Sequence, residues 1–532
     1  MAQIEIKNLT FYYPDMETGE YLNKPALKDI CLHIHQGEFV VICGKTGCGK
    51  STLLKNLKPP ICPKGKINGR VFFQDVHISE LGERAQAEMI GFVMQNPDNQ
   101  IVTDKVWHEL AFGLENLGYS SEEIRLRTAE TAEYFELTDL YFSDTDKLSG
   151  GQKQILNLAA IMTMQPKVLI LDEPTSQLDP VASEKFMNML KKINEDFGIT
   201  IIMSEHRLSF VLDAADKLVV MEDGEIINQG TPKNVAQRIS DEQLEKLLPI
   251  PARIYKKCSQ GTEIPVSVKE GRVWLESICK KPAIINDNKS KTIISKEDIA
   301  LSCKNVWFRY EKKDRDIIKG LDLSVNRGEI FAILGGNGTG KTTTMWLFSR
   351  VKKPYRGKLK VNGKTGLLPQ NVQNLFRKDS VAEELEGCPE QLIREMELED
   401  LQKRHPYDIS GGQQQKVALA KVLMEAPDIL LLDEPTKAID EIYKESLGDL
   451  LKELSRQGKT IIIVSHDLDF CGEYADRCGL FANGKLIAVN DSRDFFAGNR
   501  FYTTTVSKMA GDILKKAVKM EDVICYMKSW NR

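Results

Sequence analysis

Two glycine-rich stretches of this sequence have the residue types and the spacing needed to hold a phosphate group. They are GKTGCGKST, from Gly44 to Thr52, and GGNGTGKTT, from Gly335 to Thr343. Both fit the pattern G-x-x-x-x-G-K-[ST], in which backbone N–H groups turn toward phosphate oxygens and the following helix adds its positive end. The lysine of each copy, Lys50 or Lys341, would reach the β- and γ-phosphates. The hydroxyl that follows, on Ser51 or Thr342, would hold Mg²⁺.

Two pairs of adjacent carboxylates follow apolar runs that predict buried strands. The runs are VLILDEP at 168–174 and ILLLDEP at 429–435. The first acid of each pair, Asp172 or Asp433, suits the Mg²⁺ shell. The second acid, Glu173 or Glu434, suits polarising the water that attacks a phosphate. A solvated acidic turn is the ordinary alternative, and it fits poorly after such an apolar run.

A histidine and a glutamine occur at matching strand ends in the two halves of the chain. His206 ends the apolar run ITIIMSEH and His466 ends TIIIVSH, where either ring could hydrogen-bond a γ-phosphate. Gln95 and Gln370 end GFVMQ and GLLPQ, and an amide at such a strand tip can contact Mg²⁺ or water. One such residue alone would more often be structural or an ordinary surface residue, but the repetition favours a functional position.

The motifs LSGGQ at 148–152 and ISGGQ at 409–413 precede predicted helices over Lys153–Met164 and Gln414–Met424. The start of a helix can receive an anion, and Ser149 and Ser410 would each add a hydroxyl donor. A plain capped helix is the alternative for either copy.

Tyr13 and Tyr310 end the first strand-like run of each half, and we expect either ring to stack on adenine. A tyrosine of the core or of an edge strand is the alternative. The residues expected to contact nucleotide in the first half are Tyr13, Gly44, Lys45, Thr46, Gly47, Cys48, Gly49, Lys50, Ser51, Thr52, Ser149, Gly150, Gly151, Gln152 and Asp172. Those in the second half are Tyr310, Gly335, Gly336, Asn337, Gly338, Thr339, Gly340, Lys341, Thr342, Thr343, Ser410, Gly411, Gly412, Gln413 and Asp433. The expected metal ligands are Ser51, Gln95, Asp172, Thr342, Gln370 and Asp433, and the expected catalytic residues are Glu173, Glu434, His206, His466, Gln95 and Gln370.

The whole chain has the composition of an ordinary globular protein that is too long for one hydrophobic core. It has 532 residues, of which 42% are hydrophobic and 28% charged, and its net charge of −4 gives no global bias toward nucleic acid. Its 11 cysteines include no C-x-x-C pair, which argues against zinc or iron–sulfur sites and favours reduced thiols. We find no signal-peptide pattern and no apolar run near the roughly 20 residues of a membrane helix, so we expect any membrane role to be peripheral.

An internal repeat divides the chain, because every motif returns in the same order. The repeat predicts a first domain over 1–235, a linker over 236–298, a second domain over 299–489 and a C-terminal helical tail over 490–532. Prolines and polar runs such as INDNKSK indicate the linker, and DILKKAVKMEDVICYM is the clearest helical stretch of the tail. The motifs are more closely spaced in the second half, so its helical lobe should be the smaller one.

These motifs resemble those of the ATP-binding cassette (ABC) ATPase family. The residues Tyr13, GKTGCGKST, Gln95, LSGGQ, LILDEP, Asp179 and His206 are similar to the family's A-loop, Walker A, Q-loop, signature, Walker B, D-loop and H-loop. The second half supplies Tyr310, GGNGTGKTT, Gln370, ISGGQ, LLLDEP, Asp440 and His466. The resemblance implies an α/β fold with two P-loop NTPase (RecA-like) cassettes in tandem, each with a helical subdomain and a small antiparallel β subdomain. It also implies ATP and Mg²⁺ as ligands.

A narrower resemblance is to the ATPases of energy-coupling factor (ECF) transporters, which import vitamins and transition metals. QNPDNQ at 95–100 is similar to their Q-loop, and HPYDISGGQ and the tail sequence GNRFYTT resemble the fused, two-cassette members. One departure is that Glu205 and Arg207 flank the first histidine, whereas Asp467 follows the second. We expect two different but competent sites.

The family resemblance implies that the two cassettes pair head to tail within the chain. One site would combine Lys50, Ser51, Gln95, Asp172, Glu173 and His206 with Ser410–Gly412. The other would combine Lys341, Thr342, Gln370, Asp433, Glu434 and His466 with Ser149–Gly151. A single cassette would hold only half of a phosphate cage, so hydrolysis would require closure.

Three functions are compatible with such cassettes. The favoured one is the energy-supplying subunit of an importer, peripheral at the cytoplasmic face of the membrane and bound to a transmembrane coupling protein and a substrate-capture protein. The second is a soluble factor that acts on ribosomes or nucleic acid, but the linker has no sustained Lys/Arg run. The third, a DNA-repair ATPase, would need zinc-binding C-x-x-C pairs or a coiled-coil insertion, and neither occurs in the sequence.

Overall fold

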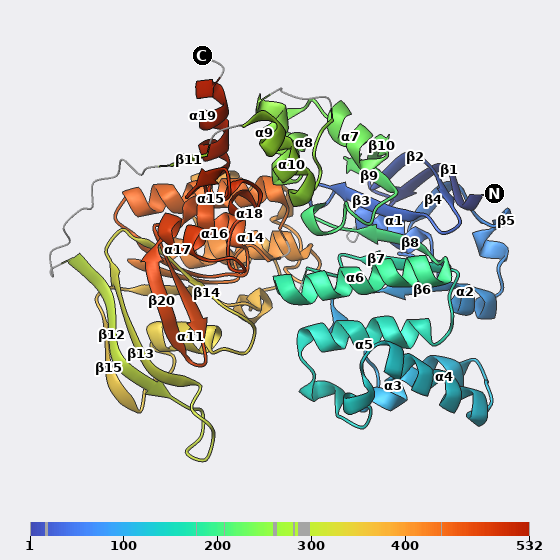
Figure 1. The fold of residues 1–532 in the computed structure, drawn as a ribbon. Coiled ribbons are helices and arrows are strands. Elements are labelled where there is room, and N and C mark those ends of the chain that lie inside the picture. Colours follow the sequence, from blue (N-terminus) through green and yellow to red (C-terminus); the bar gives the residue numbers. More distant parts are fainter. Residues whose placement is uncertain are drawn as a thin grey trace. The chain divides into compact units, whose positions relative to one another are not determined.

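The computed structural model describes residues 2–15, 20–176, 178–206, 208–258, 263–279, 282–285, 298–437 and 439–530 (Figure 1). Arg207, which flanks the first histidine, lies outside the described residues. The chain divides into two compact units, Met1–Pro249 and Ile250–Arg532, and each contains one α/β cassette.

The core of the first unit is a six-stranded sheet built from the most apolar segments of that half. Its strands lie in the order β10 (Glu225–Gly230), β9 (Lys217–Glu222), β3 (Phe39–Gly44), β8 (Thr200–Ser204), β7 (Val168–Asp172) and β6 (Ile90–Val93). All neighbours are parallel except β10, which pairs antiparallel with β9. β3, β7 and β8 are buried along their whole length, as strands covered on both faces must be. Their carboxyl ends meet at one edge of the sheet, where the phosphate loop begins.

A small antiparallel sheet and a helical lobe complete the first cassette. The small sheet has the order β2 (Leu27–His35), β1 (Ala2–Tyr12), β4 (Lys66–Phe73) and β5 (Val76–His77). The lobe contains α3 (Val106–Asn116), α4 (Ser121–Tyr134) and α5 (Gly150–Met162), with α3 packed against the other two. The remaining helices of this unit are α1 (Lys50–Asn56), α2 (Glu83–Met89), α6 (Pro180–Phe197), α7 (Pro232–Arg238) and α8 (Glu242–Glu245).

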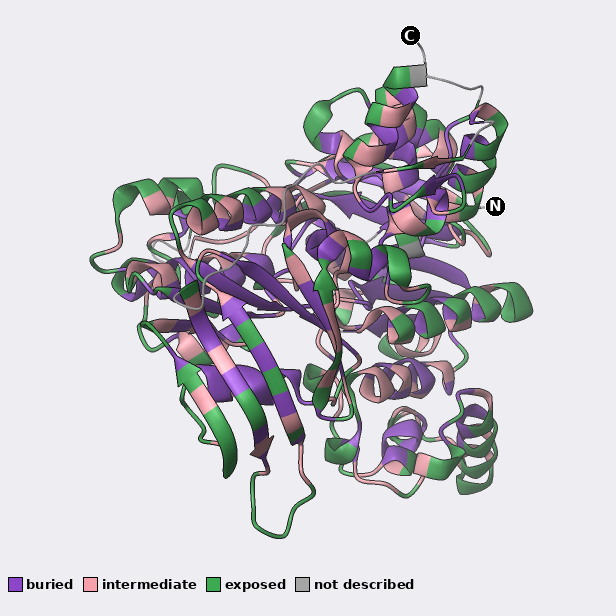
Figure 2. Ribbon diagram, turned by 60° about the vertical axis from the view of Figure 1, so that its left-hand side comes forward, coloured by how far each residue is buried: buried purple, intermediate pink, exposed green. Residues whose placement is uncertain are grey.

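The second unit repeats this plan. Its six-stranded sheet has the order β16 (Thr365–Leu368), β17 (Ile429–Asp433), β18 (Thr460–Val464), β14 (Ile330–Leu334), β19 (Arg477–Ala482) and β20 (Lys485–Asp491). Its small sheet has the order β13 (Ile318–Asn326), β12 (Ile299–Phe308) and β15 (Arg356–Val361). Figure 2 shows the difference between the uniformly buried central strands and the antiparallel strands, on which buried and exposed residues alternate. The expected fold class is confirmed in both units.

The helical lobe of the second cassette is the smaller one, as predicted. Its α12 (Val381–Glu384) and α13 (Glu390–Glu395) are both shorter than α3 and α4, while α14 (Gly411–Met424) matches α5. Both α5 and α14 begin three residues earlier than the sequence predicted. The serine of each SGGQ motif caps its helix in a capping box with the glutamine, and this brings both glycines into the first turn.

The helices α9 (Ile250–Cys258) and α10 (Val268–Ile278) come from the segment predicted to be a linker. They pack with α18 (Thr505–Ala510) and α19 (Met520–Trp530) of the tail around a core that includes Ile254, Trp274 and Val523. The pairing of β11 (Ala283–Ile284) with β21 (Leu514–Lys515) joins the same two segments. The other helices of this unit are α11 (Lys341–Phe348), α15 (Glu441–Arg456), α16 (Leu468–Tyr474) and α17 (Ser492–Gly498).

The terminal helix begins at Met520, later than the helical stretch expected from residue 512. The Asp522 carboxylate accepts the backbone N–H groups of Val518 and Lys519, each at 2.9 Å, and this cap defines the start of α19. The residues before it are held in the pairing with β11 and cannot be helical.

Asp469 on α16 ties the second cassette to the tail. Its carboxylate accepts the backbone N–H and the hydroxyl of Thr505, both at 2.7 Å. Burial raises the pKa of Asp469 to about 6, from an ordinary value of 3.8. Ionisation therefore costs folding free energy, a cost that grows as the pH rises from about 4 to about 6 and reaches about 3 kcal/mol.

We expect Asp469→Asn to unfold at a higher denaturant concentration than the wild type at pH 7, because the amide carries no charge, its oxygen still accepts the Thr505 N–H, and its NH₂ group can donate to the Thr505 hydroxyl oxygen. This advantage should shrink as the pH falls toward 4, where the native carboxyl is protonated. Asp494→Asn, at an exposed ion pair with Lys516, is the control. An Asp469→Asn protein that is less stable than the wild type at every pH would contradict this account.

Candidate functional site

Each phosphate loop joins a buried strand to a helix and curls around its own lysine. Lys50 Nζ donates hydrogen bonds to the carbonyls of Gly44 at 2.9 Å and Lys45 at 3.0 Å. Lys341 Nζ donates likewise to Gly335 at 2.8 Å and Gly336 at 2.7 Å. Both ammonium groups are thus placed over the concave side of the loop, where a phosphate oxygen would replace a carbonyl as acceptor.

The first glycine of each loop is required by its backbone conformation. Gly44 has φ 152° and Gly335 has φ 151°. A Cβ at either position would lie 2.2 Å from the carbonyl oxygen of the neighbouring strand, on Met221 or Phe481. The side chain of Cys48 packs into the core beneath the first loop, so only its backbone is available to a phosphate.

The hydroxyl and the aspartate of each expected Mg²⁺ site lie side by side, whereas the third expected ligand does not join them: Gln95 contacts Glu173, and Gln370 is exposed. Ser51 Oγ and Ser204 Oγ donate to the Asp172 carboxylate at 2.9 and 2.8 Å, and burial raises the pKa of this acid. In the second cassette Thr342 donates to Asp433, and burial again raises the pKa of the acid. Among the described residues, the buried Asp433 Oδ1 has no hydrogen-bond partner. A hydroxyl beside a buried carboxylate with an unused oxygen is a donor set that fits Mg²⁺.

In the first cassette Glu173 is the centre of a hydrogen-bonded group. Gln95 Nε2 donates to Glu173 Oε2 at 2.6 Å, and His206 Nε2 lies 2.7 Å from Glu173 Oε1. Glu173 has a left-handed backbone, φ 45°, and its N–H donates to Ser204 Oγ at 3.0 Å. The structure thus brings together the three residues that the sequence assigned to catalysis in this half.

The second cassette arranges the same residues differently. His466 Nε2 lies 3.2 Å from Glu434 Oε1 and 2.8 Å from Oδ1 of Asn337 in the phosphate loop. Glu434 also has a left-handed backbone, φ 55°, held by a bond from its N–H to the Val464 carbonyl. Gln370 is exposed, in contrast to the half-buried Gln95. The two sites therefore differ in which group the histidine and the glutamine contact.

Two residues near the first site were not assigned by the motifs. Ser204 links the backbone of Glu173 to the Asp172 carboxylate. Glu205 is buried, and its carboxylate accepts the Thr175 hydroxyl at 2.8 Å and the His206 N–H at 3.1 Å. The sequence feature that could have predicted Ser204 and Glu205 is their position directly after the apolar run TIIM, where a buried strand ends.

The remaining motif residues have structural contacts that fit their expected places. Tyr13 shares a 2.9 Å hydrogen bond with Thr52, and Tyr310 shares one of 3.0 Å with Thr343, so each ring is anchored beside a phosphate-loop helix. Ser149 and Ser410 are exposed and bond within their own helices. Asp179 and Asp440 cap α6 and α15.

Two cassettes with phosphate loops, buried carboxylate pairs and capped SGGQ helices define a class of nucleotide-hydrolysing ATPases. The ABC transporter family model matches residues 27–176 and 318–437, and the chain belongs to this family. A protein of Bacillus thuringiensis subsp. konkukian, provisionally named an ABC transporter ATP-binding protein, is 39% identical over 98% of both chains. A protein of Methanosarcina mazei with the same provisional name is 32% identical over 93% of this chain and 90% of its own. The cassettes therefore bind and hydrolyse ATP.

The fold of this chain is similar to that of a solved archaeal structure. A chain in the crystal structure of the complex of ribosomal stalk protein aP1 with ribosome recycling factor aABCE1 aligns with a TM-score of 0.58. It is 20% identical, with 92% of this chain and 91% of that chain covered, which shows a shared fold. Among the residues that the structure describes, no helix has the length and apolar character needed to cross a membrane.

We expect Glu173→Gln and Glu434→Gln each to lower ATP turnover, since each replaces the carboxylate expected to take up a proton from the attacking water by a neutral amide that cannot. Loss of a direct general base costs about 10²–10⁴-fold, and the double variant should show this full loss. Steady-state phosphate release is the measurement, with nucleotide binding as the control for an intact site. Full-rate hydrolysis by either single variant would show that its site does not contribute.

We expect Glu205→Ser, which introduces the residue that the second cassette has as Ser465, to lower turnover at the first site about tenfold or more. The change removes the carboxylate whose two oxygens accept the His206 N–H and the Thr175 hydroxyl, and a serine there keeps only a long contact with the threonine, as Ser465 does with Thr436 at 3.4 Å. Measured in a Glu434→Gln background, Glu205→Gln should retain most activity, because its carbonyl oxygen still accepts the His206 N–H and its NH₂ group can donate to the Thr175 hydroxyl oxygen. Equal losses in both variants would show that the carboxylate does more than position His206.

Proposed function

We propose that this chain is the ATP-hydrolysing subunit of an ECF-type importer for a vitamin or a transition metal. The observation that carries the proposal is the path of the QNPDNQ segment in the first unit. Gln95 at its start contacts Glu173, while Asp98 pairs with Lys153 on α5 at 2.6 Å and the Pro97 carbonyl accepts from Asn157 on α5 at 3.1 Å. Six residues therefore connect the hydrolytic carboxylate to the helix that carries the SGGQ motif.

The segment is stiff enough to transmit a movement. Gln100 closes it by accepting the Met94 N–H at 2.9 Å and donating to the Phe92 carbonyl at 3.1 Å. Asn96 caps the short turn between them. A change in the contact between Gln95 and Glu173 on hydrolysis would shift the turn and α5 together, which is what an energy-supplying subunit needs.

Exposed apolar side chains beside this segment supply a place for a partner. Val102, Trp107 and Phe142 lie on the helical lobe with exposed fractions of 63%, 38% and 77%. The backbone N–H of Trp107 donates to the backbone carbonyl of Tyr141, so Trp107 lies close in space to Phe142. Apolar groups of this size that face solvent favour a protein partner, and we propose that it is a membrane-embedded coupling subunit at the cytoplasmic face of the membrane.

We also propose that the site residues predicted from the sequence have the roles that the resemblance to ABC ATPases implies. Lys50 and Lys341 bind phosphate, and Glu173 and Glu434 orient the attacking water. The hydroxyl and carboxylate of each cassette would hold Mg²⁺, which would supply positive charge beside the phosphates. We also propose that each SGGQ helix completes the phosphate site of the other cassette on closure.

The test is co-purification from cells that express the tagged full chain. We expect membrane-embedded subunits to co-elute, and a Trp107→Glu/Phe142→Glu variant to lose them while hydrolysing ATP normally. Ile227→Glu, at an exposed apolar residue of β10, is the control. Co-elution of ribosomes in place of membrane proteins would favour the alternative, a two-cassette factor that acts on ribosomes or nucleic acid.

A further inference from the structure

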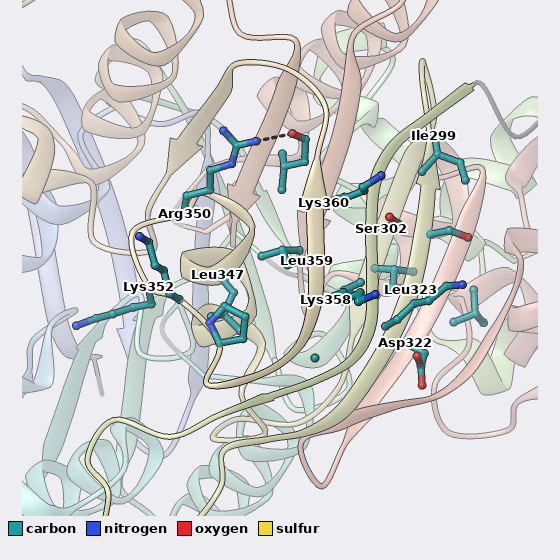
Figure 3. Close-up of a pocket in the computed structure, with 18 of the residues that line it drawn as sticks. Ile299, Ser302, Asp322, Leu323, Leu347, Arg350, Lys352, Lys358, Leu359 and Lys360 are labelled. Carbon is teal, nitrogen blue, oxygen red and sulfur yellow. Dashed lines mark hydrogen bonds between the residues drawn. The ribbon is translucent and has the colours of Figure 1, made fainter.

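The small sheet of the second cassette carries a basic groove that no motif explains. The groove has a volume of about 1330 Å³ and is lined by β12, β13, β15 and the loop after α11 (Figure 3). Its lysines are Lys304, Lys352, Lys353, Lys358 and Lys360, and all five are exposed. Among the described residues, none of these five ammonium groups has a carboxylate partner.

The nearby acids are fewer than the five lysines and offset only part of this charge. The Asp322 carboxylate, which also lines the groove, accepts the Asn305 N–H at 2.9 Å. Glu329 pairs with Arg477 at 2.9 Å. The lysines are therefore left facing solvent with a concentrated positive charge.

The strand pairing makes this charge costly to the fold. Lys304 of β12 lies directly opposite Lys358 of β15, and like charges at such a position repel. The first cassette has the same pairing, Lys7 opposite Arg70. There, however, Glu5 forms an ion pair with Lys7 at 2.8 Å.

The second cassette has lost that neutralising acid. Glu5 lies opposite Phe72 in the first cassette, and the matching pair in the second is Ser302 opposite Lys360. At these two positions the second cassette thus replaces an acid by a serine and an aromatic ring by a lysine. A repulsive cluster on one small sheet, at positions where the equivalent strands of the other carry a compensating acid, favours a partner of opposite charge.

The aromatic rings beside the groove are already engaged. Trp307 donates its indole N–H to Asn305 Oδ1 at 2.7 Å, and the Arg356 guanidinium lies 5.7 Å from its ring centre. Tyr355 donates to Asp316 at 2.8 Å and has the Arg309 guanidinium 4.7 Å from its ring centre. Single-stranded nucleic acid needs free rings on which its bases stack, so these contacts argue against it.

We propose that this basic groove binds the anionic headgroups of a phospholipid membrane. Lysines are strongly hydrated point charges without the bidentate geometry of arginine, and they suit a diffuse negative surface. A cluster of four to eight basic residues is enough for such binding. The proposal rests on the membrane-associated function proposed above, since it places the chain next to a bilayer.

The test uses the purified full chain and flotation with lipid vesicles. We expect binding to vesicles of phosphatidylcholine with phosphatidylserine, no binding to phosphatidylcholine alone, and loss of binding at high salt. Removing one lysine from such a surface weakens binding about fivefold, so Lys304→Glu/Lys358→Glu should weaken it about twentyfold or more. The matched control is Lys7→Glu/Arg70→Glu, with the same charge change at the same strand positions of the first cassette, and it should bind as the wild type does.

A second variant tests whether any loss of vesicle binding comes from misfolding. Ser302→Glu restores the acid of the first cassette, so it should relieve the Lys304–Lys358 repulsion, keep or raise the thermal stability, and still weaken vesicle binding. ATP turnover in solution should be unchanged in both groove variants.

The proposal is overturned if the wild type ignores anionic vesicles, if control and groove variants lose binding equally, or if single-stranded RNA binds the groove and vesicles do not. Because co-purification of membrane subunits is measured separately, its survival alongside a failed flotation result would overturn the lipid site alone.

Discussion

Both nucleotide sites depend on the parallel register of three buried strands. In the first cassette Asp172 at the end of β7 pairs with Ser204 at the end of β8, and Ser204 in turn pairs with Ile42 of β3. This register brings the carboxylate, the serine and the start of the phosphate loop to the same level of one sheet edge. A slip of one residue would turn Asp172 toward the opposite face and separate it from Ser51. The unbroken apolar runs hold the register, because any slip would expose or misplace buried side chains on both faces.

At this edge of the sheet, the backbone of the residue that follows each strand departs from strand geometry. Glu173 and Glu434 both have left-handed φ angles directly after their strands, although glutamate has no intrinsic preference for them. The conformation is stabilised by a hydrogen bond from the backbone N–H of each glutamate to the neighbouring strand, where the Ser204 hydroxyl oxygen accepts from Glu173 and the Val464 carbonyl accepts from Glu434. Each glutamate thus departs from strand geometry at the end of its strand, at a cost in folding free energy.

The sequence was sufficient for the features that depend on local pattern. The phosphate loops, the strands that end in two acids, and the hairpins at Asp223–Gly224 and Asn483–Gly484 follow from residue types within short windows, and the structure has them. The partners of His206 and His466 could not be predicted this way. Both histidines follow similar apolar runs and lie beside the glutamate of their own cassette, but only His466 also contacts the phosphate loop, through Asn337, which is more than 100 positions away.

The core formed by α9, α10 and the tail escaped prediction for the same physical reason. Each helix is short and amphipathic. Its apolar face is buried against residues more than 200 positions away, as in the contact of Cys279 with Met527. Prolines and polar runs nearby predicted a linker, because local composition contains no information on packing between segments that are far apart in the sequence.

The two halves of the chain therefore share a fold but not a set of contacts. In the first cassette Gln95 contacts Glu173, and the segment that follows Gln95 is bonded to α5, so one continuous set of bonds runs from the carboxylate to the helical lobe. In the second cassette the histidine contacts the phosphate loop, and the corresponding glutamine is exposed. Gln95 thus links the first carboxylate to the helical lobe, whereas in the second cassette His466 lies between the Glu434 carboxylate and Asn337 of the phosphate loop. Duplication gave both cassettes the same strands, and the differences in a few side chains at the strand ends are what make the two sites unequal.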